Sequence, residues 1–147
     1  MVLEMLKTRV QPINRRRMEC LEEARCLSDG NPLTTRQILR ALILPIGEEI
    51  AKSAHTRQTL AQLVARSFTE PARFIERMHR KFFGELCEIF MDELRKTHPM
   101  VKEEDLNWNL NLAISSMLGA LAQHRRLREF SKGTCDEDDT CDMIERL

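Results

Sequence analysis

Histidines and cysteines are the residues of this chain best suited to metal binding, and the histidines show no ligand spacing. The four histidines are His55, His79, His98 and His124. None lies three or four residues from another histidine, a cysteine or a carboxylate pair in an arrangement typical of zinc sites. The sequence therefore predicts no metal site. His79 is the most interesting of the four, because it lies in an apolar stretch and could offer a polar contact inside a ligand pocket.

The cysteines are equally unsuited to a disulfide framework. There are five, an odd number, and no Cys-x-x-Cys motif is present. Cys20 and Cys26 are six residues apart, as are Cys135 and Cys141, and on one helix that spacing puts the sulfur atoms on opposite sides, too far apart to bridge. This usage is typical of reduced thiols, and we expect a cytoplasmic protein.

No catalytic motif is apparent. The chain has no nucleophile elbow, no glycine-rich phosphate loop and no zinc-protease signature. Acidic runs at 48–49 and 103–105 are expected at helix ends or on polar faces, where carboxylates are solvated. We predict a protein that is not an enzyme and that needs no cofactor.

The charge balance argues against a broad nucleic-acid-binding surface. The 23 basic and 23 acidic residues give a formal net charge of zero, whereas such surfaces carry a basic excess that neutralises phosphates. Two local basic clusters, 15–17 and 124–128, are read as solvated helix faces, with direct DNA binding through Arg15, Arg16 and Arg17 kept as an alternative. No apolar run approaches the ~20 residues of a membrane helix, and the first residues do not resemble a signal peptide.

The elements that must carry these side chains are helices. Leu, Ala, Glu, Arg, Met and Gln dominate the composition, and all of them favour helices. We expect an all-α fold, an antiparallel bundle of about six helices with short connections. The predicted helices cover residues 2–27, 34–54, 56–68, 71–96 and 102–130, followed by a short terminal helix after the acidic residues 136–139.

Three local features refine these helices. Pro12 predicts a kink or short break near residues 8–11, because proline lacks the N–H that a helix interior uses. Thr34 and Gln37 have the spacing of a capping box at the start of a helix. Pro45 predicts a bend halfway along that helix.

The helix at 71–96 is apolar on more than one face, so we expect it at the centre of the domain. Methionine and phenylalanine are prominent in it, and methionine adapts to varied apolar guests. A close-packed core is the alternative interpretation. The predicted lining of a ligand pocket consists of Leu42, Ile43, Ile46, Leu63, Met78, His79, Phe82, Leu86, Ile114 and Met117.

The helix at 102–130 has two usable faces. A Leu, Ile and Met stripe is expected to pack inward, whereas the other side is apolar but built largely of small residues that allow a partner helix to approach closely. Such a patch can meet its own copy across a two-fold axis. The predicted dimer interface consists of Trp108, Leu112, Ser115, Ser116, Gly119 and Ala122.

Three segments resemble TetR/AcrR-family transcriptional regulators. Residues 11–17 are similar to the first helix after their DNA-binding domain, residues 33–42 with Pro45 to their next helix, and residues 106–121 to their penultimate, dimer-forming helix. The likeness spans nearly the whole chain as a pattern, without an invariant motif.

This resemblance implies that residues 1–147 are a TetR C-terminal effector-binding and dimerisation domain, and that the DNA-binding helix-turn-helix domain expected upstream of residue 1 is missing. The implied partners are a second copy of the chain and a small hydrophobic effector, fatty-acyl or another apolar molecule, with DNA reached only through the missing domain. Effector entry would shift the first helix and release the full-length repressor from DNA. The rival interpretation is a helical dimerisation module without a ligand pocket.

Overall fold

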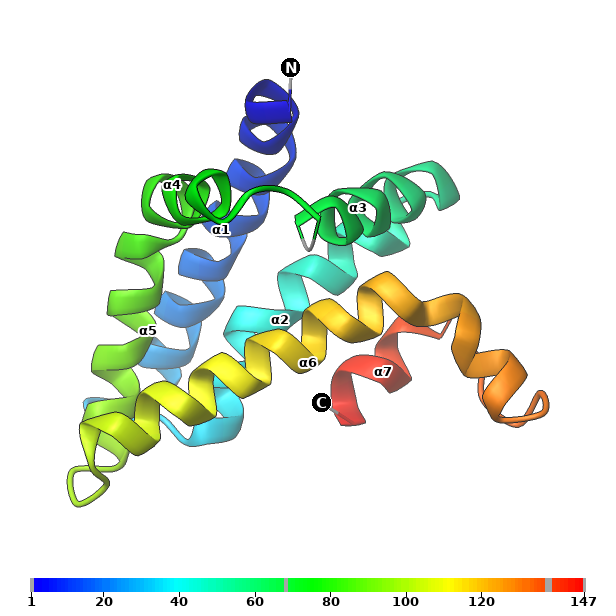
Figure 1. The fold of residues 1–147 in the computed structure, drawn as a ribbon. Coiled ribbons are helices and arrows are strands. Elements are labelled where there is room, and N and C mark those ends of the chain that lie inside the picture. Colours follow the sequence, from blue (N-terminus) through cyan, green and yellow to red (C-terminus); the bar gives the residue numbers. More distant parts are fainter. Residues whose placement is uncertain (1, 68, 137–138, 147) are drawn as a thin grey trace.

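The computed structural model describes residues 2–67, 69–136 and 139–146, and within them it contains seven helices and no strand (Figure 1). The side chains of residues 2, 3, 5, 6, 67, 123–125, 140 and 141 are also outside the description. The predicted basic cluster at His124 and Arg125 therefore lies outside the described residues, as do Glu137 and Asp138. The helices are α1 (Val2–Leu27), α2 (Thr35–Ala51), α3 (Ala54–Ser67), α4 (Ala72–Phe82), α5 (Gly84–Thr97), α6 (Glu103–Phe130) and α7 (Thr140–Arg146).

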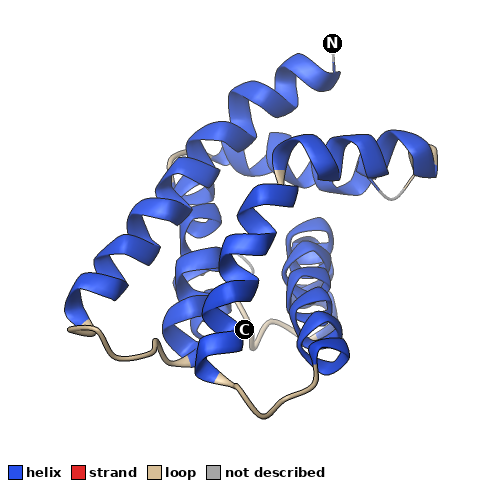
Figure 2. Ribbon diagram, turned by 90° about the vertical axis from the view of Figure 1, so that its left-hand side faces the viewer, coloured by secondary structure: helices blue, strands red, loops and turns tan. Residues whose placement is uncertain are grey.

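The all-α prediction is confirmed, and loops of different lengths join the helices (Figure 2). α1 packs along α2, and α6 packs against both α3 and α5. The terminal helix α7 packs on α2, where Ile144 is buried and Glu145 accepts hydrogen bonds from Arg36 and Arg40. This packing links the last helix to the second one.

The predicted break at Pro12 is wrong, because α1 continues without interruption from Val2 to Leu27. Pro12 is exposed, so the carbonyl group that loses its helical donor is close to solvent and can be hydrated. One uninterrupted helix therefore runs along the domain.

The predicted capping box is confirmed at the start of α2. The Thr34 hydroxyl accepts a hydrogen bond from the Gln37 backbone N–H at 3.2 Å, and the Gln37 side chain accepts one from the Thr34 N–H at 2.8 Å. α2 continues through Pro45 and ends at Ala51, three residues before the predicted end.

The single helix predicted over residues 71–96 is wrong. It is divided into α4 and α5 at Phe83, whose φ of −125° departs from helical geometry, and Gly84 then begins α5. A glycine at this point weakens a continuous helix, because it loses the most backbone entropy on ordering. No residue of α4 is buried, so the predicted central position applies to α5 alone.

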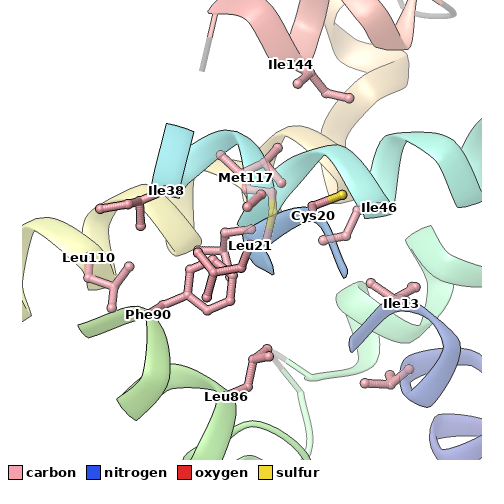
Figure 3. Packing of buried hydrophobic residues seen from close by; sticks show 14 of the residues in the cluster. Ile13, Cys20, Leu21, Ile38, Ile46, Leu86, Phe90, Leu110, Met117 and Ile144 are labelled. Atoms are coloured by element: carbon pink, nitrogen blue, oxygen red, sulfur yellow. The ribbon is translucent and has the colours of Figure 1, made fainter. Parts of the chain in front are cut away.

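The core is centred on Phe90 of α5, which is 1% exposed. Figure 3 shows its ring in a cluster to which α1 contributes Leu21 and α6 contributes Leu110 and Met117. Leu33 and Ile38, at the start of α2, are also fully buried. Four segments distant in sequence thus share one apolar centre.

A buried carboxylate links the end of α1 to α5. Glu93 is buried, and its Oε1 accepts hydrogen bonds from Arg25 Nη2 at 2.6 Å, Arg25 Nε at 3.0 Å and Lys96 Nζ at 3.0 Å. Burial alone raises the pKa of Glu93, but the hydrogen bonds and charges of Arg25 and Lys96 outweigh it, and the net pKa lies below the ordinary value. Glu93 is therefore ionised at neutral pH.

Candidate functional site

A cavity of about 300 Å³ lies among the first six helices. This volume is at the lower end of the roughly 300–1,000 Å³ typical of small-molecule sites. The cavity is therefore the candidate functional site. The rival interpretation, a helical dimerisation module without a ligand pocket, stays a prediction.

The cavity wall is almost entirely apolar. Of its 18 residues, only Arg17, His79 and Cys87 have polar side chains. The predicted pocket residues found in this wall are Leu42, Ile46, Leu63, Met78, His79, Leu86, Ile114 and Met117. Their role in binding a ligand stays a prediction.

Two predicted residues are not in the wall. Ile43 is buried in the core, because it follows Leu42 by one residue and so points about 100° further around the helix. Phe82 is at the end of α4, where it is partly buried and Lys81 Nζ lies 5.7 Å from its ring centre. Its neighbour Phe83 lines the cavity instead, a consequence of the break between α4 and α5.

Sequence reasoning missed the contribution of α1. The wall residues that were not predicted are Val10, Ile13, Arg17, Leu60, Val64, Ile75, Phe83, Cys87, Leu118 and Leu121. Val10, Ile13 and Arg17 follow the i, i+3, i+7 spacing of one helix face. The sequence feature that could have indicated this contribution is an arginine within an otherwise apolar stripe.

Arg17 is the one charged residue in the wall whose side chain is buried, at 4% exposure. Its Nε donates to the Leu42 carbonyl at 2.7 Å, and its Nη1 donates to Asn14 Oδ1 at 2.9 Å. No carboxylate of the described residues forms an ion pair with it. Burial lowers the pKa of Arg17 to about 10, an effect that nearby Cys87 opposes, so Arg17 is still a cation at neutral pH.

The three consecutive arginines do not form one basic face. Arg17 is buried, and Arg16 forms ion pairs with Glu19 at 3.3 Å, Glu23 at 3.0 Å and Glu48 at 3.1 Å. Only Arg15 is exposed. The triplet therefore does not present three free charges on one surface, because Arg17 is buried and Arg16 is paired with carboxylates. Direct DNA binding through it stays a prediction.

The other two polar wall residues offer little chemistry. The His79 ring lies 5.5 Å from that of Phe83, at an angle of 45°. Burial raises the pKa of the Cys87 thiol, despite the opposing charge of Arg17, so this sulfur is a thiol at neutral pH and a poor nucleophile. In the part of the chain that the structure describes, no group of three His, Cys, Asp or Glu residues could hold a metal ion.

The two faces predicted for α6 are confirmed. Leu106, Leu110, Met117 and Leu121 are buried on one side. On the other, Trp108 is 61% and Leu112 is 56% exposed.

The rest of the outer face is small or polar. Ser115 and Ser116 are exposed, whereas Gly119 and Ala122 are partly exposed, and nothing lies within 4 Å of the position a Cβ would take at Gly119. The face is therefore open, and its pairing with a second copy stays a prediction. None of the helices, so far as they are described, is long and apolar enough to cross a membrane.

Comparison with known proteins gives one family. A family model described as the C-terminal domain of tetracyclin repressor-like proteins matches residues 40–147, from α2 to the end of the chain. No curated protein and no solved structure matches the chain.

Proposed function

The chain belongs to the family of tetracycline repressor-like C-terminal domains, and we propose on this premise that it senses a small hydrophobic effector and forms homodimers in a TetR-type transcriptional repressor. Domains of this family generally bind ligands and dimerise in regulators. The observation that carries the proposal is the apolar cavity of about 300 Å³.

Affinity in such a cavity comes from apolar burial. Each Å² of apolar surface removed from water contributes about 25 cal/mol. The wall has few polar groups that could form hydrogen bonds with a ligand. Small apolar or amphipathic molecules are therefore the class of effector we propose.

The wall also supports a route for signalling. α1 contributes Val10, Ile13 and Arg17, so an occupant contacts the helix that would follow a DNA-binding domain. An effector that favours one position of α1 over another shifts the equilibrium by its difference in affinity for the two. In a full-length repressor, that movement would displace the DNA-binding helices.

Replacing Ile114 with Trp tests the site. We expect 1-octanol, a neutral apolar probe, to bind the parent saturably in isothermal titration calorimetry. Ile114 lines the cavity, so the indole of Ile114→Trp occupies part of its volume. Affinity should fall at least about tenfold, which requires the loss of only ~1.4 kcal/mol of apolar burial.

The matched control is Leu27→Trp, which adds the same ring at an exposed residue and should leave octanol binding unchanged. Absence of saturable binding to the parent would refute the sensor proposal, as would equal binding by both variants.

Replacing Gly119 with Arg tests the dimer. Because the space beside Gly119 is open, the new side chain does not disturb the folded protomer, but it places two cations at a two-fold contact. We expect sedimentation velocity to show a dimer for the parent and a monomer for Gly119→Arg. The control is Gln58→Arg, the same charge change at an exposed residue of α3. A variant that stays as dimeric as the parent would show that this face is not the interface.

A further inference from the structure

The guanidinium group of Arg17 is buried and charged, and no described residue gives it an anionic partner. Two of its five N–H groups are engaged, by the neutral oxygens of Leu42 and Asn14. The others, including both on Nη2, find no acceptor among the residues that the structure describes. A buried cation without a counter-charge is costly to maintain.

Among the residues that the structure describes, no carboxylate pairs with Arg17. Apart from His79, the other residues of the cavity wall are apolar or, in Cys87, a protonated thiol. The nearby carboxylates of Glu19, Glu23 and Glu48 are engaged by Arg16 instead. The described residues therefore leave the charge of Arg17 available to an anion that enters the cavity which Arg17 lines.

We propose that the occupant of this cavity is an amphipathic carboxylate, whose carboxylate group pairs with Arg17 while its hydrocarbon chain fills the apolar space. The inference rests on the proposed function, since it specifies the ligand of the same cavity. The family match begins at residue 40, so it does not include α1 and assigns nothing to Arg17.

A carboxylate suits this position better than a neutral polar group. Its two oxygens match the planar guanidinium in a bidentate pair, and hydrogen bonds between charged groups are roughly twice as strong as neutral ones. The uncommitted N–H groups on Nη1 and Nη2 of Arg17 provide such a pair. A cationic headgroup would add a second buried positive charge and is excluded on the same ground.

The cavity volume guides the choice of a probe. At roughly 30 Å³ for each water-sized group, a volume of about 300 Å³ accommodates about ten non-hydrogen atoms. Octanoate, which has that size, is the appropriate probe. Much longer chains would extend beyond the cavity.

The test compares three eight-carbon probes that differ only in the headgroup. Calorimetric titrations with octanoate, 1-octanol and octylammonium, each kept below its micelle concentration, measure binding to the parent. We expect octanoate to bind at least about tenfold more tightly than octanol, as a charge-assisted hydrogen bond predicts, and octylammonium not to bind. Without a cation the order would be reversed, because a carboxylate is far more costly than a hydroxyl to remove from water.

The variant Arg17→Gln then tests whether Arg17 causes the preference for octanoate over octanol. The amide can still donate to the Leu42 carbonyl, but the charge is gone, so octanoate should bind no better than octanol while octanol binding persists. Arg17→Lys should retain a preference for octanoate, weakened by the loss of the planar fork. The control is Arg15→Gln, the same change at an exposed residue of α1, which should behave as the parent does.

The outcomes separate the two proposals. Octanol binding as tightly as octanoate to the parent would overturn the carboxylate inference and leave the apolar site intact, whereas saturable binding by none of the probes would refute the proposed function itself. A preference for octanoate that survives in Arg17→Gln would show that another group recognises the anion. Because the comparison of headgroups uses the parent protein, it decides the inference even where Arg17→Gln fails to fold.

Discussion

Replacement of Phe90 by Ala is expected to destabilise the domain by roughly 3–5 kcal/mol, the range found for removing a buried aromatic ring. Phe90 is 1% exposed and lies in a cluster of buried apolar residues to which α1, α2, α5 and α6 contribute (Figure 3). Truncating it removes apolar burial and leaves a void that several helices border, so the surroundings can collapse only in part.

Urea unfolding followed by circular dichroism at 222 nm measures this loss. Phe130→Ala is the matched control, since Phe130 is 85% exposed and its truncation should change the free energy of unfolding by less than about 0.5 kcal/mol. Equal effects of the two substitutions would show that Phe90 is not at the packing centre.

Replacement of Arg25 by Met is expected to cost about 3 kcal/mol, because it leaves the buried Glu93 carboxylate with Lys96 as its remaining partner. Breaking a buried pair by removing one partner costs roughly 3–5 kcal/mol, and the partial exposure of Arg25 puts this case at the low end. Arg15→Met, on the exposed face of the same helix, is the control and should be nearly neutral.

The stability loss expected for Arg25→Met also depends on pH, in a direction that follows from the pKa of Glu93. The pKa of Glu93 is lowered in the folded state, so its contribution to stability is fully present above the unfolded value of ~4.3 and is lost as the pH falls through the folded value. Protonation also relieves the buried carboxylate that Arg25→Met leaves with Lys96 as its remaining partner. The difference between parent and variant should therefore shrink between about pH 7 and pH 3, and a constant difference would exclude the ion pair as its cause.

Much of the helical architecture could be predicted, because it depends on local patterns. The capping box at Thr34 and Gln37 and the two-faced helix α6 follow from spacing alone. The continuity of α1 through Pro12 and the division at Phe83 could not be predicted in the same way. The first depends on Pro12 being exposed, and the second on the packing of α4 and α5 against different parts of the domain.

The cavity wall, too, could be predicted only in part from the sequence. Its apolar wall on α2 and α6 could be located, since Leu42, Ile46, Ile114 and Met117 follow from helical periodicity. The burial of Arg17 could not, because a charged residue is ordinarily placed in solvent and only the tertiary structure shows which helices enclose it. Arg16, its neighbour in sequence, follows this expectation, because its side chain is partly exposed and forms ion pairs.

Because α4 contributes Ile75, Met78 and His79 to the cavity wall yet buries no residue of its own, stability is unevenly distributed around the cavity. The described side-chain hydrogen bond between α1 and α4 joins Asn14 Nδ2 to the Phe82 carbonyl at 2.8 Å. Local unfolding of α4 therefore costs less free energy than unfolding of the helices that carry the core. We therefore expect this wall to open at a lower free-energy cost than the rest of the domain unfolds, and the residence time of an occupant to depend on the opening rate of α4 as well as on its affinity.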